Sequence, residues 1–193
     1  MRQYAAQRAG RKRAPLGMRN FVGILRQIFG GKRQRARLDP LYRAIVDHAR
    51  RRAWYVEGGV PDTVDGRFDM IAAILALVLL RLEADGNKAR RESVLLTETF
   101  IDDMDGSIRQ MGIGDLMVGK HVGRMVGALG GRLSAFRDAL AAGTGFSGPV
   151  RRNIFHESPP SEAALDFVAR GLEDFHRGLA ALPADSLLAG RIR

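Results

Sequence analysis

Beyond residue 38, apolar residues recur along the chain at steps of three and four, which is the spacing of one face of an α-helix. No stretch alternates apolar and polar residues clearly enough to predict a strand, and proline is rare within the apolar runs. The pattern therefore predicts an all-α protein whose body is a single compact helical domain. The predicted helices cover residues 39–52, 65–82, 88–111, 115–142 and 161–183.

Turn-forming residues separate these predicted helices. Asp39 followed by Pro40 predicts a helix start, with Asp39 as the N-cap and Pro40 at the first helical position. Gly112 is expected to end the helix that precedes it. Residues 143–160 are rich in glycine, serine and proline, which predicts a loop, and the tail after Pro183 is expected to fray.

The most apolar run of the chain is Ile71–Leu80, which is ten residues long. A helix that spans a membrane needs roughly 20 apolar residues, so this run is too short for that role. Charged residues also stand close to both of its ends. We therefore expect the run to form the buried core helix of the domain.

The first 37 residues differ from the rest of the chain in their charge. They hold eleven Lys and Arg residues and no Asp or Glu, whereas residues 38–193 hold 20 basic and 21 acidic residues. The net charge of +10 thus describes a near-neutral domain (38–193) with a cationic N-terminal arm (1–37), which is attracted to polyanions. The arm has no Ser or Thr, unlike a mitochondrial transit peptide, and this favours an arm retained in a bacterial-type protein.

Within the arm, apolar residues between positions 18 and 29 share one face of a predicted amphipathic helix that Gly30 and Gly31 end. Basic clusters flank this helix, which is typical of a segment that lies on an anionic membrane surface. Docking on the ribosome and packing on the protein's own body remain open as alternatives. The residues expected to contact membrane or ribosome are Arg11, Lys12, Arg13, Phe21, Leu25, Ile28, Phe29, Lys32 and Arg33.

Glycine recurs at every fourth position of the predicted 115–142 helix, at Gly119, Gly123, Gly127 and Gly131. Each glycine costs up to about 1 kcal/mol of helix stability relative to alanine, so four on one flank indicate that another backbone approaches closely. Two interpretations remain open at this point. The glycines form a groove for a partner's helix, or they pack against another helix of this chain.

Carboxylates gather on the predicted 88–111 helix, where paired carboxylates at helical spacing could bind a divalent metal or perform acid–base chemistry. No His-Glu-x-x-His or Gly-x-Ser-x-Gly motif occurs, and the chain has no Cys. We therefore predict no catalytic set, no metal and no cofactor, and interpret the acidic residues as a polar face or as a docking patch for cations such as Arg109 and Arg132. The carboxylates are Glu98, Asp102, Asp103 and Asp105.

Several segments resemble the ubiquinol–cytochrome c chaperone family. The most specific is Ile108–Lys120, which ends in Gly-Asp-Leu-x-Val-Gly-Lys. Gly131–Phe136, the Trp54-Tyr55 pair and the stretch from Gly59 to Asp69 are similar to that family as well. The resemblance covers about residues 39–142, with one departure at Leu129-Gly130, where a larger aromatic residue is expected.

This resemblance implies an assembly factor rather than an enzyme. Its members bind newly synthesised cytochrome b and help to build the cytochrome bc complex, near the ribosome and the inner membrane, with a small helper protein. The implied location is cytoplasmic and peripheral on the inner membrane in bacteria, or the matrix side of a mitochondrion. Taken together with the patterns above, the expected client- or partner-binding residues are Trp54, Tyr55, Asp102, Asp103, Arg109, Asp115, Gly119, Lys120, Gly123, Gly127 and Arg132.

Two other functions are compatible with parts of the sequence. A basic-armed module that binds nucleic acid would explain the arm, but the near-neutral body lacks stacking aromatics and a recognition helix. A metal-dependent helical enzyme would use Asp102, Asp103 and Asp105. Trp54 and Tyr55 are likewise open to two interpretations, because a tryptophan beside a glycine-rich turn more often belongs to the core than to a binding surface.

Overall fold

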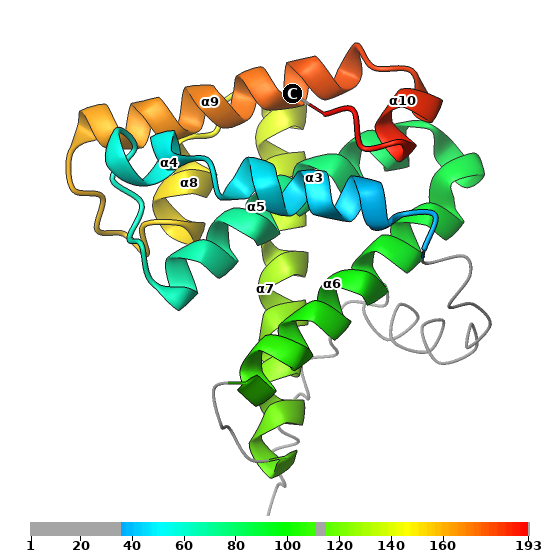
Figure 1. The fold of residues 1–193 in the computed structure, drawn as a ribbon. Coiled ribbons are helices and arrows are strands. Elements are labelled where there is room, and N and C mark those ends of the chain that lie inside the picture. Colours follow the sequence, from blue (N-terminus) through cyan, green and yellow to red (C-terminus); the bar gives the residue numbers. More distant parts are fainter. Residues whose placement is uncertain (1–35, 111–114, 193) are drawn as a thin grey trace, which may run out of the picture. The chain divides into compact units, whose positions relative to one another are not determined.

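The computed structural model describes residues 36–110 and 115–192, with the backbone alone for Lys88, Ile108 and residues 115–121. These residues belong to one compact unit, residues 32–193 (Figure 1). The described part is helical and contains no strand, so the predicted all-α class is confirmed. Its elements are α3 (Asp39–Ala49), α4 (Arg52–Val56), α5 (Val64–Ala84), η1 (Gly86–Ala89), α6 (Arg90–Gln110), α7 (Asp115–Ala142), α8 (Ser147–Asn153), α9 (Glu162–Ala180) and α10 (Ala184–Leu188).

Helix α5 is the core helix that the apolar run predicted. Every residue from Met70 to Leu79 is at most 5% exposed. A helix that is apolar on all sides must be covered on all sides, and α5 contacts α3, α6, α7 and α9. Thr63 caps its N-terminus, because the Thr63 hydroxyl accepts a hydrogen bond from the Gly66 amide at 3.1 Å. Within the described residues, no helix combines the length and apolar character needed to cross a bilayer.

The start of α3 differs from the prediction by one residue. Asp39 is the first helical residue rather than the N-cap, and Leu38 takes the cap position without a side-chain cap bond. The Leu38 carbonyl accepts the amide of Tyr42 at 2.8 Å, and its side chain is buried in the core. Burial of an apolar side chain therefore outweighs the preference for a polar cap at this position.

The segment predicted as a loop, residues 143–160, contains helix α8, so that prediction was wrong in part. Two side chains around the start of α8 carry the packing. Phe146 is 1% exposed and lies edge-on to Phe136 of α7 at a centroid distance of 4.8 Å, and Val150 is fully buried. Because the stability of so short a helix comes from tertiary packing, the local glycine and proline content did not reveal it.

The tail after Pro183 forms helix α10 and does not simply fray as predicted. Leu187 of α10 is fully buried, and α10 packs against α3. Gly190 lies so close to α3 that an added Cβ would stand 2.5 Å from the Pro40 carbonyl oxygen. The start of α9, by contrast, is confirmed, since the Ser161 hydroxyl accepts the Ala164 amide at 3.0 Å.

Helices α6 and α7 run together away from the other helices, towards the ends that residues 111–114 connect (Figure 1). The predicted break at Gly112 lies outside the described residues. The arm residues 1–35 also lie outside them, so the predicted contacts of the arm, from Arg11 to Arg33, stay predictions.

Candidate functional site

The glycine flank of α7 is open. Gly123, Gly127 and Gly131 are all exposed, and a Cβ added to any of them would meet no other described atom within 4 Å. These three glycines therefore do not pack closely against any other helix among residues 36–110 and 115–192. Their shared flank is a smooth surface on which the backbone of α7 can be approached closely by another helix. The surroundings of Gly119 lie outside the described residues.

The carboxylates of α6 are engaged in separate contacts. Asp103 accepts a hydrogen bond from the Tyr42 hydroxyl at 2.8 Å, which ties α6 to α3. Burial, followed by this bond, raises the pKa of Tyr42, so the phenol stays a donor. Asp105 pairs with Arg109 at 2.7 Å along the helix surface. Within the described residues, no group of three or more His, Cys, Asp or Glu side chains is arranged to hold a metal ion.

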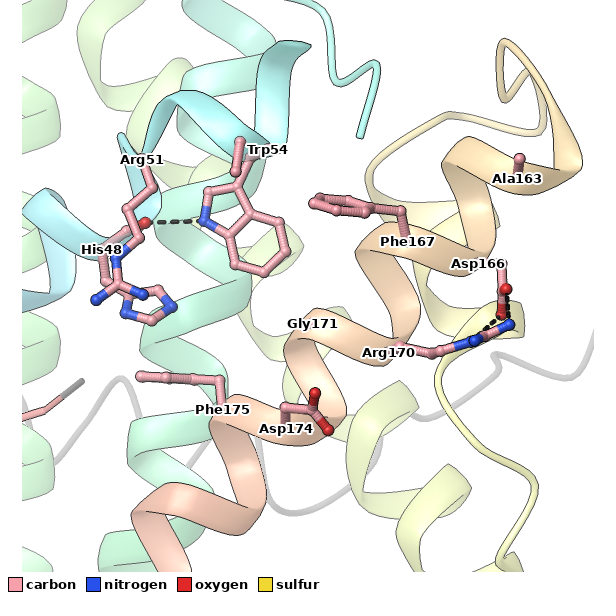
Figure 2. A pocket seen from close by; sticks show the side chains of 11 residues that line it. His48, Arg51, Trp54, Ala163, Asp166, Phe167, Arg170, Gly171, Asp174 and Phe175 are labelled. Atoms are coloured by element: carbon pink, nitrogen blue, oxygen red, sulfur yellow. Dashed lines mark hydrogen bonds and ion pairs between the residues drawn. The ribbon is translucent and has the colours of Figure 1, made fainter. Parts of the chain in front are cut away.

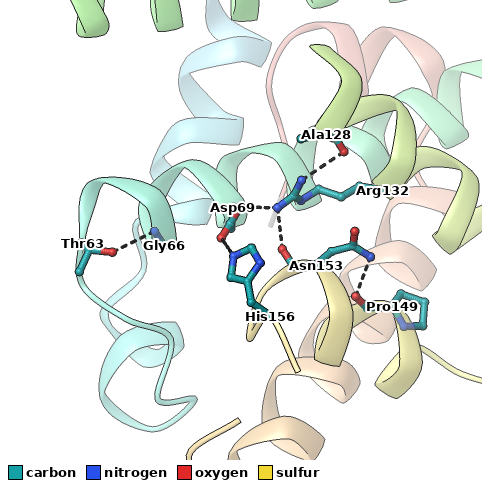
Figure 3. Close-up of polar contacts among 8 residues, drawn as sticks. All are labelled: Thr63, Gly66, Asp69, Ala128, Arg132, Pro149, Asn153 and His156. Carbon is teal, nitrogen blue, oxygen red and sulfur yellow. Dashed lines mark hydrogen bonds and ion pairs between the residues drawn. The ribbon is translucent and has the colours of Figure 1, made fainter. Parts of the chain in front are cut away.

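Arg132 does not join the acidic patch on α6, so its predicted docking to those carboxylates was wrong. It is 3% exposed and forms a buried ion pair with Asp69 of α5 (Figure 3). Nη2 of Arg132, which contacts Asp69, also donates to the Asn153 carbonyl at 2.6 Å. Nη1 donates to the Ala128 carbonyl at 3.1 Å. The guanidinium also lies 5.6 Å from the centre of the Phe68 ring, a cation–π contact. Arg132 is thus an internal tie rather than a surface contact.

Asp69 is the centre of this network. Its second carboxylate oxygen lies 2.7 Å from Nε2 of His156, in the α8–α9 connection. Burial raises the pKa of Asp69 and lowers that of Arg132, and the attraction between the two groups opposes both shifts. The network joins α5, α7 and the α8–α9 connection, where His156 and Glu157 both have positive φ, 48° and 67°. Its arrangement fixes these elements relative to one another.

Trp54 is buried, yet its ring also forms part of the floor of a groove (Figure 2). The indole nitrogen donates to the His48 carbonyl at 2.8 Å, and the neighbouring Tyr55 hydroxyl donates to the Ala49 carbonyl at 2.9 Å. Both hydrogen bonds return to the end of α3 and fix the orientation of α4. Trp54 is therefore a core residue that also forms part of the floor of a surface groove, and its predicted role in binding stays a prediction.

A match to a family model shows which family this chain belongs to. The model of the family described as ubiquinol-cytochrome C chaperone matches residues 56–193. The chain belongs to the ubiquinol–cytochrome c chaperone family. The match extends further towards the C-terminus than the segments named above for their resemblance to the family, and it includes α8, α9 and α10.

The fold of this family member also agrees with a solved structure. The crystal structure of the Cbp3 homolog from Brucella abortus matches with a TM-score of 0.70 and 24% sequence identity, over 92% of this chain and 94% of that chain. At this level of identity the match shows a shared fold. A search of curated proteins finds no significant match.

The family match assigns no site residues in this chaperone, and the structure brings only some of the predicted ones together. Gly123 and Gly127 lie on one open flank of α7. For Asp115, Gly119 and Lys120 only the helical backbone is described. Asp69 and His156 were not predicted as partners of Arg132. The one available indication was an aspartate next to an apolar run, since a buried carboxylate requires a partner.

Proposed function

We propose that this protein is an assembly chaperone for the ubiquinol–cytochrome c reductase complex and that it binds newly synthesised cytochrome b. Membership of the family supports the first part of this proposal. The observation that supports the second part is the flank of α7, where an added Cβ at Gly123 or Gly127 would meet no atom of the described residues within 4 Å.

An open glycine flank suits an apolar helical client. Within a bilayer, the helices of membrane proteins associate through close backbone approach and van der Waals contact, which small residues permit. The side chains of larger residues would hold the two helices apart. Each exposed glycine also lowers the helix stability of α7. In this proposal, the requirement for client binding explains why glycine occupies these positions.

Polar residues beside this flank complete the proposed client surface. Asp102, Asp103 and Arg109 lie on α6, which packs against α7, and all three are exposed. Asp115, Gly119 and Lys120 precede the open glycines on α7 itself. We place Trp54 and Tyr55 outside this surface, because their hydrogen bonds belong to the α3–α4 junction. Arg132 lies in the interior, where its ion pair with Asp69 holds α7 against α5.

The cationic arm suggests where in the cell the protein is held. Eleven Lys and Arg residues without a carboxylate are attracted to anionic lipid or to ribosomal RNA, and both lie close to a membrane protein during its synthesis. We propose that the arm holds the chaperone peripherally at the inner membrane or at the ribosome. A small helper protein, which the family resemblance implies, would bind elsewhere on the helical domain.

A strain that lacks this protein tests the proposal at its broadest. We expect its membranes to lose cytochrome b protein and assembled, quinol-oxidising bc complex while the cytochrome b transcript remains. That combination would place the defect after transcription. Normal levels of the complex would contradict the chaperone function and favour the nucleic-acid-binding alternative.

Complementation with glycine variants tests the site. Gly123→Leu and Gly127→Leu should fail to restore the complex, because leucine covers the flank that the client helix approaches. Leucine favours helix over glycine by roughly 0.5–1 kcal/mol, so the variants should not be lost through unfolding of α7. Gly178→Leu on α9 is the matched control, since Gly178 is also exposed and an added Cβ there also meets nothing within 4 Å. Full restoration by Gly123→Leu would exclude this client site.

A further inference from the structure

A groove runs along α9 where this helix faces the end of α3 and α4 (Figure 2). Its cavity has a volume of about 640 Å³. Ala163, Phe167, Gly171 and Phe175 line it from α9 at steps of four, so they form one stripe along that helix. The stripe is about 18 Å long, from the rise of 1.5 Å per residue in a helix. None of the lining residues belongs to α6 or α7.

The floor of the groove is aromatic and recessed. Trp54 and Phe175 are 5% and 4% exposed, whereas Phe167, whose ring lies edge-on to Trp54 at 6.4 Å, is 40% exposed. Gly171 makes room for the indole, because a Cβ there would stand 2.7 Å from the Trp54 ring. A recessed floor below an exposed phenylalanine receives inserted side chains, whereas a flat lipid surface would require the apolar residues to protrude.

His48 gives the groove a polar atom without a partner. The imidazole is 5% exposed and lies 4.2 Å from the Phe175 ring, centroid to centroid, among the lining residues. Its Nδ1 has no hydrogen-bond partner among the described residues. Buried polar atoms are rarely left unpaired in folded proteins, so we expect a water molecule or an occupant of the groove to complete this hydrogen bond.

The charges of the groove determine the kind of occupant. On α9, Asp166 pairs with Arg170 and Asp174 pairs with Arg177, so these side chains are already neutralised. Arg51, on the opposite side of the groove, has no ion pair with a described carboxylate. The uncompensated charge of the groove is therefore positive and lies on one side. An occupant with a carboxylate on the matching side complements it.

We propose that this groove binds an amphipathic helix of a partner protein, with bulky apolar side chains against Trp54 and Phe167 and a carboxylate facing Arg51. A stripe of this length accommodates about three helical turns, and recognition of this kind places apolar anchors at helical spacing into a groove. The groove is separate from the glycine flank of α7. The proposal therefore goes beyond cytochrome b binding and does not rest on it.

The single tryptophan of the chain gives a direct readout, because Trp54 forms part of the groove floor. The probes are two helical peptides with the same leucine stripe, one flanked by glutamates and the other by lysines. We expect the glutamate peptide to change the Trp54 fluorescence of the full chain saturably. The lysine peptide should bind at least about tenfold more weakly, as expected when a charge pair is replaced by a repulsive one.

Two variants test whether the binding occurs in this groove. Arg51→Glu should reverse the preference between the two peptides, and Phe167→Ala should weaken both by about tenfold through loss of a central aromatic contact. The matched controls are Arg152→Glu, an exposed arginine on α8, and Leu140→Ala, whose side chain is 40% exposed like that of Phe167. Both controls should bind the glutamate peptide as the original chain does, and circular dichroism should show the same helix content for all four.

Three results would overturn this proposal. The first is equal binding of the two peptides, or a preference that Arg51→Glu leaves unchanged. The second is no fluorescence change with either peptide at about 1 mM, a concentration at which even weak specific binding is seen. The third is an equal response to anionic lipid vesicles that Arg51→Glu and Phe167→Ala abolish, which would assign the groove to a membrane surface. Cytochrome b takes no part in the experiment, so its outcome is independent of the proposed function.

Discussion

Arg132 on α7 and Asp69 on α5, 63 residues apart in the chain, form a buried ion pair to which His156 and the Asn153 carbonyl also bind. The side chains of the pair are 4% and 5% exposed. Two buried charges lose much of their hydration, and their mutual attraction and further hydrogen bonds offset this loss. The pair therefore determines how α7, which carries the glycine flank, is held against the core helix.

Removal of one partner should destabilise the domain strongly. Arg132→Met leaves Asp69 buried without its cation, and we expect it to lower the free energy of unfolding by about 3–5 kcal/mol. Arg137→Met on the same helix is the control, because Arg137 and Glu83 pair at an exposed position, 46% and 45%. There the expected loss is at most about 1 kcal/mol. Urea unfolding at pH 7 measures both, and equal midpoints for the two variants would contradict a structural role for the buried pair.

A double variant separates the cost of an unpaired charge from the value of the pair. Asp69→Leu combined with Arg132→Met replaces both charges by apolar groups, so no uncompensated charge remains. We expect this variant to be more stable than Arg132→Met alone, by at least about 1 kcal/mol. A double variant less stable than either single variant would mean that packing, rather than charge, dominates at this site.

His48 should make stability depend on pH. Burial, followed by the charge of Arg51, lowers its pKa from 6.5 to about 4. At pH values between about 4 and 6.5, His48 therefore binds a proton in the unfolded chain but not in the folded chain. The corresponding stability is fully present above pH 6.5 and is lost as the pH falls towards 4, by roughly 2.5 kcal/mol at pH 4.5. His48→Phe should lack this loss.

Urea unfolding of the original chain and of His48→Phe at pH 7 and pH 4.5 measures this difference. Carboxylates and other histidines titrate in the same range, so the comparison between the two proteins isolates His48. Burial also lowers the pKa of His176, and His176→Phe therefore serves as a second reference. The same pH slope in the original chain and in His48→Phe would show that His48 is protonated in the folded protein.

Gly171 and Gly178, both in α9, should respond in opposite ways to alanine. A Cβ at Gly171 would stand 2.7 Å from two atoms of the Trp54 ring, whereas a Cβ at Gly178 meets nothing within 4 Å. The free energy of unfolding should therefore fall by about 1–3 kcal/mol in Gly171→Ala, because overpacking outweighs the better helix propensity of alanine. In Gly178→Ala the free energy of unfolding should rise by up to about 1 kcal/mol. Thermal unfolding, followed with Trp54 fluorescence and circular dichroism, compares them.

Gly190 tests whether the C-terminal tail is part of the domain. Its φ of 74° and a Cβ position 2.5 Å from the Pro40 carbonyl both disfavour a side chain. Gly190→Ala should lose more stability than Gly143→Ala, whose φ is 64° but whose Cβ would meet nothing within 4 Å. The second variant carries only the backbone strain, about 1–2 kcal/mol. Similar urea midpoints for the two would indicate that the tail separates from α3.

The long helices follow from periodicity alone, because amphipathic and fully apolar patterns of this length have few other solutions. The core role of α5 and the bounds of α7 were predicted in this way. The short helices α4, α8 and α10 were not, because their stability depends on the burial of Trp54, Phe146, Val150 and Leu187. Their stability depends on contacts made by residues distant in the chain, which no local pattern records.

The sequence by itself determined the helical class, the contrast between a cationic arm and a near-neutral domain, and the family resemblance. These depend on composition, periodicity and local motifs. Only the tertiary structure decided that the glycines of α7 face outwards, that Arg132 points inwards to Asp69, and that Trp54 forms part of a groove. Each of these depends on which side of a helix meets its neighbours. That choice follows from the balance of burial and charge over the whole domain, because side chains that share a local pattern gain different free energies from different neighbours.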